Sequence, residues 1–284
     1  MVAMFRPIYR ALCAIVILCS IGSCNDCDLP DTPQKEETKE RAELPSFDQI
    51  EEHTLLSARV MSYNVRNCKG TDNVVDYKRV ADVIAAHKVE AVAIQELDSM
   101  TTRYPNQDVL KNLAEYTGMH PTFGAAIKHR GGKYGVGVLT REKPISHYTV
   151  PLPCSSEPRV LLVVELESYY FCSTHFSLHA EYRKQAVDII IEEMQKLNKP
   201  TIVAGDLNAL RSEASIQTLA KHFYILEKQG NVNTFPSGSP TKEIDYICIY
   251  KDKGASVVVS ESWVSQIPIF SDHRPIVADF TICQ

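Results

Sequence analysis

The chain has 284 residues, of which 44% are hydrophobic, and a formal net charge of −5. This length allows one large α/β domain or two small ones. The apolar content is ordinary for a globular core, which excludes a chain that is disordered throughout. The sequence shows no internal repeat.

The N-terminus has the features of a secretory signal. Two arginines precede the apolar run 11–19, which is too short to cross a bilayer comfortably. The alternative for this run is a buried strand. The run leads into the tetrapeptide IGSC, residues 21–24, which resembles a bacterial lipobox. We therefore expect a signal peptide over residues 1–23 and a lipid anchor at Cys24, which becomes the mature N-terminus.

The next segment differs in composition from the rest of the chain. Residues 25–52 contain ten acidic and three basic side chains, with three prolines and almost no apolar periodicity. This composition predicts a flexible acidic tether over residues 24–52. The protein would then lie in the bacterial cell envelope, anchored to a membrane and facing the periplasm or the cell exterior.

The remaining domain, residues 53–284, is formally neutral, with 25 acidic and 25 basic residues. A protein that grips long nucleic acids usually carries a basic surplus, because neutralising phosphates dominates that affinity. The balance therefore favours a smaller substrate. It does not exclude nucleic acid as a substrate, since bound metal cations offset acidic side chains.

The first part of the domain alternates between strand and helix. Apolar patterns predict a strand over 58–65, a helix over 76–87, a short buried strand over 91–95 and a helix over 107–116 that Gly118 ends. The middle of the chain is mostly β, with a turn at the two glycines 131–132. The strands expected there are 134–140, 145–150, 160–166 and 169–174.

The last part begins with the longest expected helix, 180–197, followed by a strand over 201–204 and a helix over 213–221. Five further strands follow, near Tyr224, near Val232, and over 244–250, 255–260 and 275–282. Two antiparallel-rich sheets, each backed by helices, would bury these runs on both faces. We therefore expect a four-layer α/β/β/α domain.

Polar residues whose side chains can bind Mg²⁺ or phosphate lie at or near the ends of the apolar runs. Because a sheet gathers its strand ends in space, residues far apart in sequence can line one cleft. Taken singly, each has an ordinary structural alternative, such as a turn, a cap or a salt bridge. The residues are Asn64, Glu96, His175, Asp206 with Asn208, Asp245, and Asp272 with His273.

Six short motifs that contain these residues resemble, in order, those of the endonuclease/exonuclease/phosphatase superfamily of deoxyribonuclease I-like metal hydrolases. The resemblance runs from about residue 59 to residue 280, and with the lipobox it implies an exported bacterial lipoprotein member. The motifs are SYN at 62–64, IQE at 94–96, STH at 173–175, GDLN at 205–208, IDY at 244–246 and SDH at 271–273.

The expected cofactor is Mg²⁺, for which Mn²⁺ could substitute. Mg²⁺ is a hard cation that accepts one or two carboxylates, keeps waters and coordinates phosphate oxygens. Glu96 is suited to anchor it, with Asn64 and Asp272 nearby. Whether one or two metal ions bind stays open.

The remaining motif residues suit the hydrolysis of a phosphate ester by water. His273 beside a carboxylate can act as a general base, and the resemblance names Asp245 as that carboxylate. Asp206 and Asn208, two apart on an expected extended segment, would address the nucleophile and the phosphate together. His175, if protonated, would stabilise the extra negative charge on the phosphoryl group.

The substrate is less well specified than the reaction. Arg159 begins a strand and is a candidate substrate contact, with a surface ion pair as the alternative. Phosphomonoesters, phosphodiesters and nucleic acid all remain possible. Arg66 and His175 both differ from the pattern of the abasic-site endonucleases. The Thr-His motif at His175 is instead similar to the phosphatase, sphingomyelinase and deoxyribonuclease I branches. A surface binding lipoprotein that kept the fold without catalysis is the rival from another class.

Two further properties are expected of the domain. The protein should be a monomer. An exported domain could also pair two of its cysteines, although the sequence does not choose the pair. The five candidates are Cys68, Cys154, Cys172, Cys248 and Cys283.

Overall fold

The computed structural model describes residues 55–251 and 256–283. The expected signal peptide, the lipid anchor at Cys24 and the acidic tether lie outside the described residues. Within the described residues, no helix is both long and apolar enough to cross a membrane.

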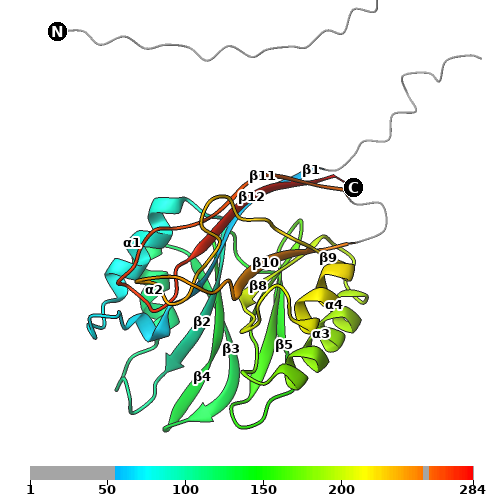
Figure 1. The fold of residues 1–284 in the computed structure, drawn as a ribbon. Coiled ribbons are helices and arrows are strands. Elements are labelled where there is room, and N and C mark those ends of the chain that lie inside the picture. Colours follow the sequence, from blue (N-terminus) through cyan, green and yellow to red (C-terminus); the bar gives the residue numbers. More distant parts are fainter. Residues whose placement is uncertain (1–54, 252–255, 284) are drawn as a thin grey trace, which may run out of the picture. The chain divides into compact units, whose positions relative to one another are not determined.

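The first of two sheets has six strands in the order β11-β12-β1-β2-β4-β3 (Figure 1). Helices α1 and α2 pack their apolar faces onto one side of it. The strands are β1 Leu55–Asn64, β2 Ala91–Ser99, β3 His120–His129, β4 Gly132–Thr140, β11 Ser256–Val264 and β12 Ile276–Cys283. The helices are α1 Tyr77–His87, α2 Val109–Thr117 and a 3-10 turn, Arg66–Cys68.

The second sheet also has six strands, in the order β5-β6-β7-β8-β10-β9. Helices α3 and α4 cover one side of it. The strands are β5 Ser146–Leu152, β6 Arg159–Glu165, β7 Tyr170–His175, β8 Thr201–Asp206, β9 Phe223–Ile225 and β10 Asp245–Tyr250. The helices are α3 Ala180–Met194 and α4 Ala214–His222.

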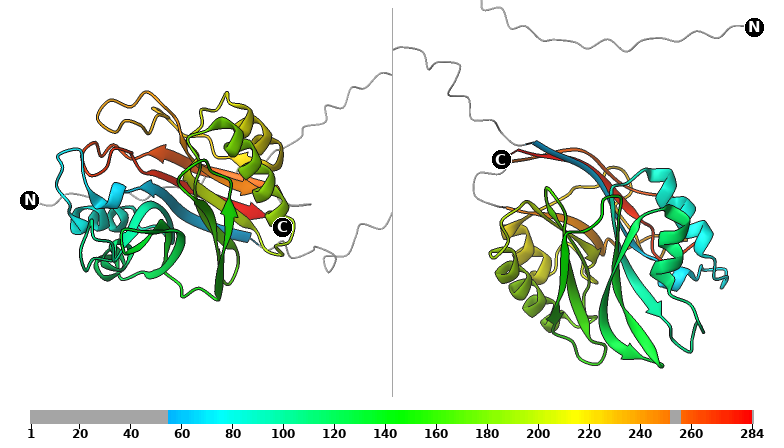
Figure 2. Two further views of the ribbon diagram at one scale, coloured as in Figure 1. Left: turned by 90° about the horizontal axis from the view of Figure 1, so that it is seen from below. Right: turned by 180° about the vertical axis from the view of Figure 1, so that it is seen from behind.

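The two sheets pack face to face, with the helices on the outside, as Figure 2 shows. Inward-facing residues of both sheets, such as Val60 and Ala93 from one and Leu162 and Phe171 from the other, form one fully buried cluster. Burying each large apolar side chain of this kind contributes about 1.5–3 kcal/mol to folding. The four-layer α/β/β/α architecture expected from the sequence is confirmed.

Local signals set the ends of the first two helices. Asp76 and Asp108 cap α1 and α2, each accepting a hydrogen bond from a backbone N–H of the first turn. Gly118 ends α2 with a φ of +67°, as its position in the sequence predicts.

Each sheet contains one central parallel pair among otherwise antiparallel described strands. In the first sheet β1 and β2 are parallel and are joined through α1, and in the second β7 and β8 are parallel and are joined through α3. The carboxyl ends of parallel strands share one edge of a sheet, where ligand sites commonly form. Asn64, His175 and Asp206 are the last residues of their strands.

The structure corrects several expected elements. Strand β3 was not expected, and it gives a weak signal because many of its residues are exposed and it contains Pro121 and Gly124. No strand forms at Val232, which lies in a long irregular segment before β10. Helix α3 ends at Met194, three residues earlier than the periodicity indicated.

The structure shows no disulfide among the cysteines of the described residues, although an exported domain could have paired two of them. All five cysteines of the described residues are free. Cys68, Cys172 and Cys248 are buried, and burial raises the thiol pKa of each. They serve as small apolar core residues.

Candidate active site

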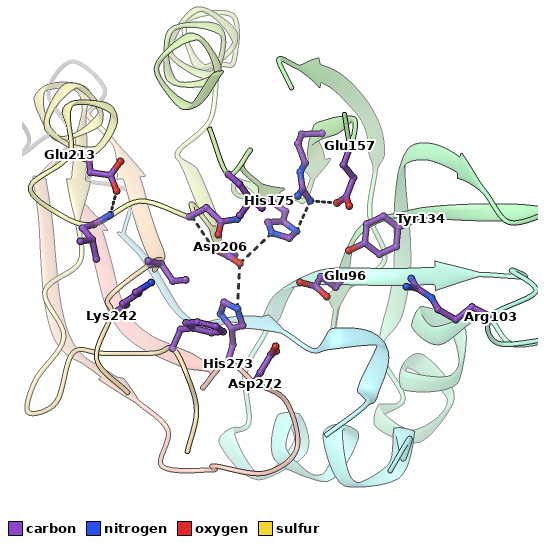
Figure 3. Close-up of a pocket in the computed structure, with 16 residues that line it drawn as sticks. Glu96, Arg103, Tyr134, Glu157, His175, Asp206, Glu213, Lys242, Asp272 and His273 are labelled. Carbon is purple, nitrogen blue, oxygen red and sulfur yellow. Dashed lines mark hydrogen bonds and ion pairs between the residues drawn. The ribbon is translucent and has the colours of Figure 1, made fainter. Parts of the chain in front are cut away.

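A cleft of about 660 Å³ is lined by residues from both sheets (Figure 3). Most of the predicted site residues reach its surface: Glu96, Arg159, His175, Asp206, Asn208, Asp272 and His273. Asn64 and Asp245 are fully buried and lie behind this surface, hydrogen-bonded to residues that line it. The strand ends therefore meet as the sequence predicted.

Strand register explains why these residues converge. His175 and Asp206 are direct partners across the parallel pair β7–β8, and Asp206 faces Asp245 across the antiparallel pair β8–β10. Asn64 faces Gln95 across β1–β2, which brings the adjacent Glu96 to the same edge.

Glu96 stands at a β-bulge. The register of β2 against β4 shifts between Ile94 and Leu97, and Glu96 has a φ of +59°. A bulge re-aims a side chain, and the left-handed backbone of a non-glycine residue is strained. Here the result is that Glu96 faces the cleft within a strand whose neighbouring side chains are buried.

Asp206 is the centre of the hydrogen-bond network. Its Oδ2 accepts a bond from Asn64 Nδ2 at 3.1 Å and lies 3.3 Å from His175 Nε2 and 3.6 Å from His273 Nε2. Its Oδ1 accepts a bond from the backbone N–H of Asn208. Burial alone raises the pKa of Asp206, but the charge of His273 and the bonds from His175 and Asn208 hold it below its usual range. Asp206 is therefore a buried, ionised acceptor.

His273 and Asp245 form a buried pair. Nδ1 of His273 lies 2.9 Å from Oδ2 of Asp245, which also accepts a bond from the Thr234 hydroxyl. Phe235 packs against the imidazole ring, with centroids 4.8 Å apart. Burial lowers the pKa of His273, but the carboxylates of Asp245 and Asp206 outweigh it and raise the pKa to about 10.

Glu96 and Asp272 offer the oxygen donors that a hard divalent cation prefers. Both carboxylates line the cleft, and both remain partly exposed. Asn64 donates a bond from Nδ2 to Glu96 Oε1 at 3.0 Å, while its Oδ1 accepts a bond from the backbone N–H of Arg66. Asn64 therefore holds Glu96 in place, and its own role as a metal ligand stays a prediction.

A second group of potential metal ligands, Asp206, Asp245 and His273, has ligand atoms within 4.8 Å of one another. Both ring nitrogens of His273 already face carboxylates, and Asp245 Oδ2 is shared between His273 and Thr234. These ligand atoms are therefore already engaged by contacts within the protein. The chemistry of the donors therefore favours Glu96 and Asp272 for a hard divalent cation.

The segment after β8 is a turn, so the expectation of an extended segment there is wrong. Asn208 has a φ of +47°, and its backbone N–H bonds to the side chain of Asp206 two residues earlier. This is an Asx turn, in which a side-chain oxygen takes the place of a backbone carbonyl. Asn208 also donates from Nδ2 to the Phe176 carbonyl, and it still lines the cleft.

Arg159 lines the cleft and is more than nine-tenths buried. Its Nη1 lies 2.7 Å from Glu157 Oε1 and 2.9 Å from His175 Nδ1. Arg159 thus joins an ion pair and also contacts a predicted catalytic residue. Contact with the substrate stays a prediction.

Several lining residues were not expected from the sequence. Arg103 forms a bidentate ion pair with the buried Asp98, and its guanidinium lies 5.7 Å from the centroid of the Tyr134 ring. Among them, only Glu157 could have been found from the sequence, because it lies two residues before Arg159, which was already a candidate. The others are Arg103, Tyr134, Phe235 and Lys242, with Leu178, Leu210, Glu213 and Ile244.

Comparison with known proteins agrees with this geometry. The sequence profile of the Endonuclease/Exonuclease/phosphatase family matches residues 61–273, which is most of the chain. No curated protein sequence matches the chain significantly.

Solved structures share the fold at low sequence identity. An endonuclease/exonuclease/phosphatase from Bacteroides vulgatus superposes with a TM-score of 0.67 at 17% identity, over 79% of this chain and 98% of that one. A mannosyl-6-phosphatase of Bacteroides thetaiotaomicron has a TM-score of 0.64 at 18% identity, over 79% and 99%. The human Nocturnin catalytic domain, with a bound sulfate anion, has a TM-score of 0.58 at 16% identity, over 81% and 97%.

The profile match and the arrangement of strand-end residues lead to one conclusion. The chain belongs to the endonuclease/exonuclease/phosphatase family of divalent-metal-dependent hydrolases that act on phosphate esters.

Proposed function

We propose that the protein is a Mg²⁺-dependent phosphoesterase that hydrolyses a small phosphate ester by direct attack of water. The observation that carries this proposal is the buried His273–Asp245 pair facing Asp206, in a cleft that also presents Glu96 and Asp272. A histidine oriented by a buried carboxylate and oxygen ligands for a cation lie together around one cleft of about 660 Å³.

The arrangement addresses the two obstacles to hydrolysis. Water attacks phosphorus poorly at neutral pH, and the ester oxygen leaves poorly as an alkoxide. Mg²⁺ held by Glu96 and Asp272 would supply positive charge that polarises the ester and lowers the pKa of nearby groups. Asp206 orients the attacking water. Asp245 fixes the His273 ring so that its Nε2 faces Asp206.

The charge of the cleft supports a small substrate. Its lining contains five carboxylates and three arginine or lysine side chains, and the whole domain is formally neutral. His273 also lines the cleft and is positive at its raised pKa, which leaves an excess of one negative charge. One bound divalent cation would therefore make the cleft net positive, which suits a single phosphate group. A long polyanion would require a basic surface that extends beyond the cleft. The likeness in fold to a mannosyl-6-phosphatase supports a phosphomonoester further.

Nuclease activity is the alternative, supported by the family assignment. The test is hydrolysis by the purified full chain with Mg²⁺ of p-nitrophenyl phosphate, bis-p-nitrophenyl phosphate, sugar phosphates, and single- and double-stranded oligonucleotides. The proposal predicts that a monoester or small diester is turned over with the highest kcat/KM. Faster cleavage of oligonucleotides would replace it with the nuclease alternative, and no turnover of any ester would favour a binding protein.

We also propose that the enzyme acts in the bacterial cell envelope, anchored by lipid at Cys24. The support is the order of segments in the sequence: an apolar run, the IGSC tetrapeptide and the acidic tether. An enzyme in this location meets external phosphate esters.

A further inference from the structure

Arg159 makes a contact that restricts the chemistry of His175. Its guanidinium Nη1 lies 2.9 Å from Nδ1 of His175, and both side chains are more than nine-tenths buried. On its far side the imidazole places Nε2 3.3 Å from Asp206 Oδ2, as the dashed line in Figure 3 shows. His175 is therefore held between a cation and a carboxylate.

The donor chemistry of arginine decides which ring nitrogen carries the proton. A guanidinium has five N–H donors and no acceptor, and it stays charged at all ordinary pH values. A hydrogen bond between Arg159 and His175 therefore requires Nδ1 to accept, which means that Nδ1 carries no proton. The one proton of the ring is then on Nε2, which donates it to Asp206.

We propose that Arg159 is a positioning residue that holds His175 in the neutral state with its proton on Nε2. His175 then acts as an oriented hydrogen-bond donor to Asp206. This role differs from the one expected from the sequence, in which a protonated His175 would stabilise charge on the phosphoryl group. A protonated ring would direct an N–H of its own at the guanidinium.

Glu157 completes the arrangement. Its Oε1 lies 2.7 Å from Arg159 Nη1, so the guanidinium has a counter-ion, although Glu157 itself is about half exposed. Glu157, Arg159, His175 and Asp206 form a continuous chain of contacts across one wall of the cleft. The inference rests on the proposed function for its kinetic consequences only, because the protonation state can be measured without turnover.

The direct test is NMR of the full chain labelled with ¹⁵N-histidine at neutral pH. The His175 signals are assigned by their absence from a His175→Gln sample. The expected spectrum shows Nδ1 without a proton and Nε2 with one, and Arg159→Met shifts this pattern. Arg59→Met, which removes an arginine from its ion pair with Asp279 away from the cleft, should leave it unchanged. A wild-type His175 with a proton on Nδ1 overturns the proposal.

The kinetic test uses the special chemistry of glutamine at position 175. A glutamine oxygen can accept from Arg159 and its nitrogen can donate to Asp206, so it mimics the neutral tautomer but cannot carry charge. His175→Gln should keep at least about tenfold more kcat than His175→Ala, and Arg159→Met should lose about 10- to 100-fold, as when orienting partners of functional histidines are removed. Equal losses in the Gln and Ala variants overturn the proposal. Arg159→Lys, which cannot accept a hydrogen bond either, should keep the wild-type tautomer and covers the case in which Arg159→Met does not fold.

Discussion

Asp206 is the residue at which the two halves of the site meet. It receives a hydrogen bond from Asn64 of the first sheet, and His175 and His273 approach the same oxygen from other elements. Three nitrogens that surround one buried carboxylate oxygen keep that carboxylate ionised, in agreement with its lowered pKa. A single buried charged residue thus joins the two sheets at the site.

His273 and Asp245 should act as one unit. Removal of a general acid or base typically costs about 10²- to 10⁴-fold, so His273→Ala and Asp245→Ala should each lose at least about 10²-fold in kcat. The double variant should be little worse than the poorer single variant. Steady-state kinetics of the three variants measure this, and fully additive losses would show that the two residues work separately.

Glu96 should govern the response to metal. Glu96→Gln replaces a charged oxygen with a neutral amide at a hard cation, so it should weaken Mg²⁺ binding while the fold is kept. Activity should recover partly at high Mg²⁺ concentration. Metal titration of the activity provides the measurement, with the melting temperature as a control for folding. Unchanged metal affinity and turnover would remove Glu96 from the ligand set.

The site residues at strand ends could be predicted from the sequence, whereas most of the other side chains that line the cleft could not. His175 and Asp206 each close an apolar run, so both their chemistry and their position are visible in the sequence. Arg103 lies in an irregular segment after β2, and Tyr134 lies inside β4. Nothing local indicates that these two side chains meet, because the contact depends on how β3 and β4 extend the sheet.

Among the elements, the parallel pair β7–β8 positions His175 against Asp206. Gly205 is the residue that allows the backbones of these two strands to lie close together. A Cβ at position 205 would lie 2.0 Å from the Thr174 carbonyl oxygen of the neighbouring strand. Gly205→Ala should therefore destabilise the protein by about 1–3 kcal/mol or more, as overpacking does, and should reduce kcat.

Gly238→Ala is the matched control for this prediction, because a Cβ there meets no atom within 4 Å. It should leave stability and kcat near the wild-type values. Thermal denaturation and initial rates compare the two variants. A Gly205→Ala protein as stable and active as Gly238→Ala would contradict the assigned role of the β7–β8 pair.

A buried ion pair connects the irregular segment before β10 to the site. Lys228 is almost fully buried, its Nζ lies 2.7 Å from Glu243 Oε1, and it donates to the backbone carbonyl of Asp245. Arg211 contacts the other oxygen of Glu243. Glu243→Gln should cost about 3–5 kcal/mol near neutral pH, because it leaves the Lys228 charge buried without its carboxylate. Glu227→Gln, at an exposed partner of Arg211, should change stability by less than about 0.5 kcal/mol.

The loss of stability in Glu243→Gln should depend on pH in a defined direction. Burial raises the pKa of Glu243, but Lys228 and Arg211 outweigh it and hold the pKa below its ordinary value of 4.5. The contribution of the Glu243 carboxylate is therefore complete above that value and is lost as the pH falls through the lower pKa of the folded state. Urea denaturation should show the difference between wild type and Glu243→Gln shrinking on acidification. A difference that grows at low pH would contradict the ion pair.

The layers were predictable from alternating apolar periodicities, but the order of strands within each sheet was not. Strand β12 pairs with β1 although their residues lie more than 200 positions apart, as for Ser57 and Thr281. Such pairing depends on which strand edges meet in the assembled sheet, which the local apolar pattern does not show. The boundaries of β2 were missed for a related reason, since the bulge at Glu96 lets the strand continue to Ser99.

For the whole molecule, the proposed lipid anchor at Cys24 has a measurable consequence. One acyl chain binds membranes only marginally, at about 0.8 kcal/mol per buried CH₂, whereas the several chains of a lipobox cysteine hold a protein firmly. The full chain should therefore fractionate with membranes, and Cys24→Ala should not incorporate a clickable fatty acid. Equal labelling of both proteins, or an uncleaved N-terminus by mass spectrometry, would overturn the lipid anchor and leave the phosphoesterase proposal intact.

The central claim is that the cleft hydrolyses a phosphate ester with the aid of a divalent cation and His273. The most direct measurement is product release from the preferred ester by the wild type and by His273→Ala, before and after treatment with EDTA and after Mg²⁺ is restored. We expect turnover by the wild type that EDTA abolishes and Mg²⁺ restores, and at least about a 10²-fold loss in His273→Ala. Turnover that survives EDTA, or a His273→Ala protein as active as the wild type, would contradict the claim.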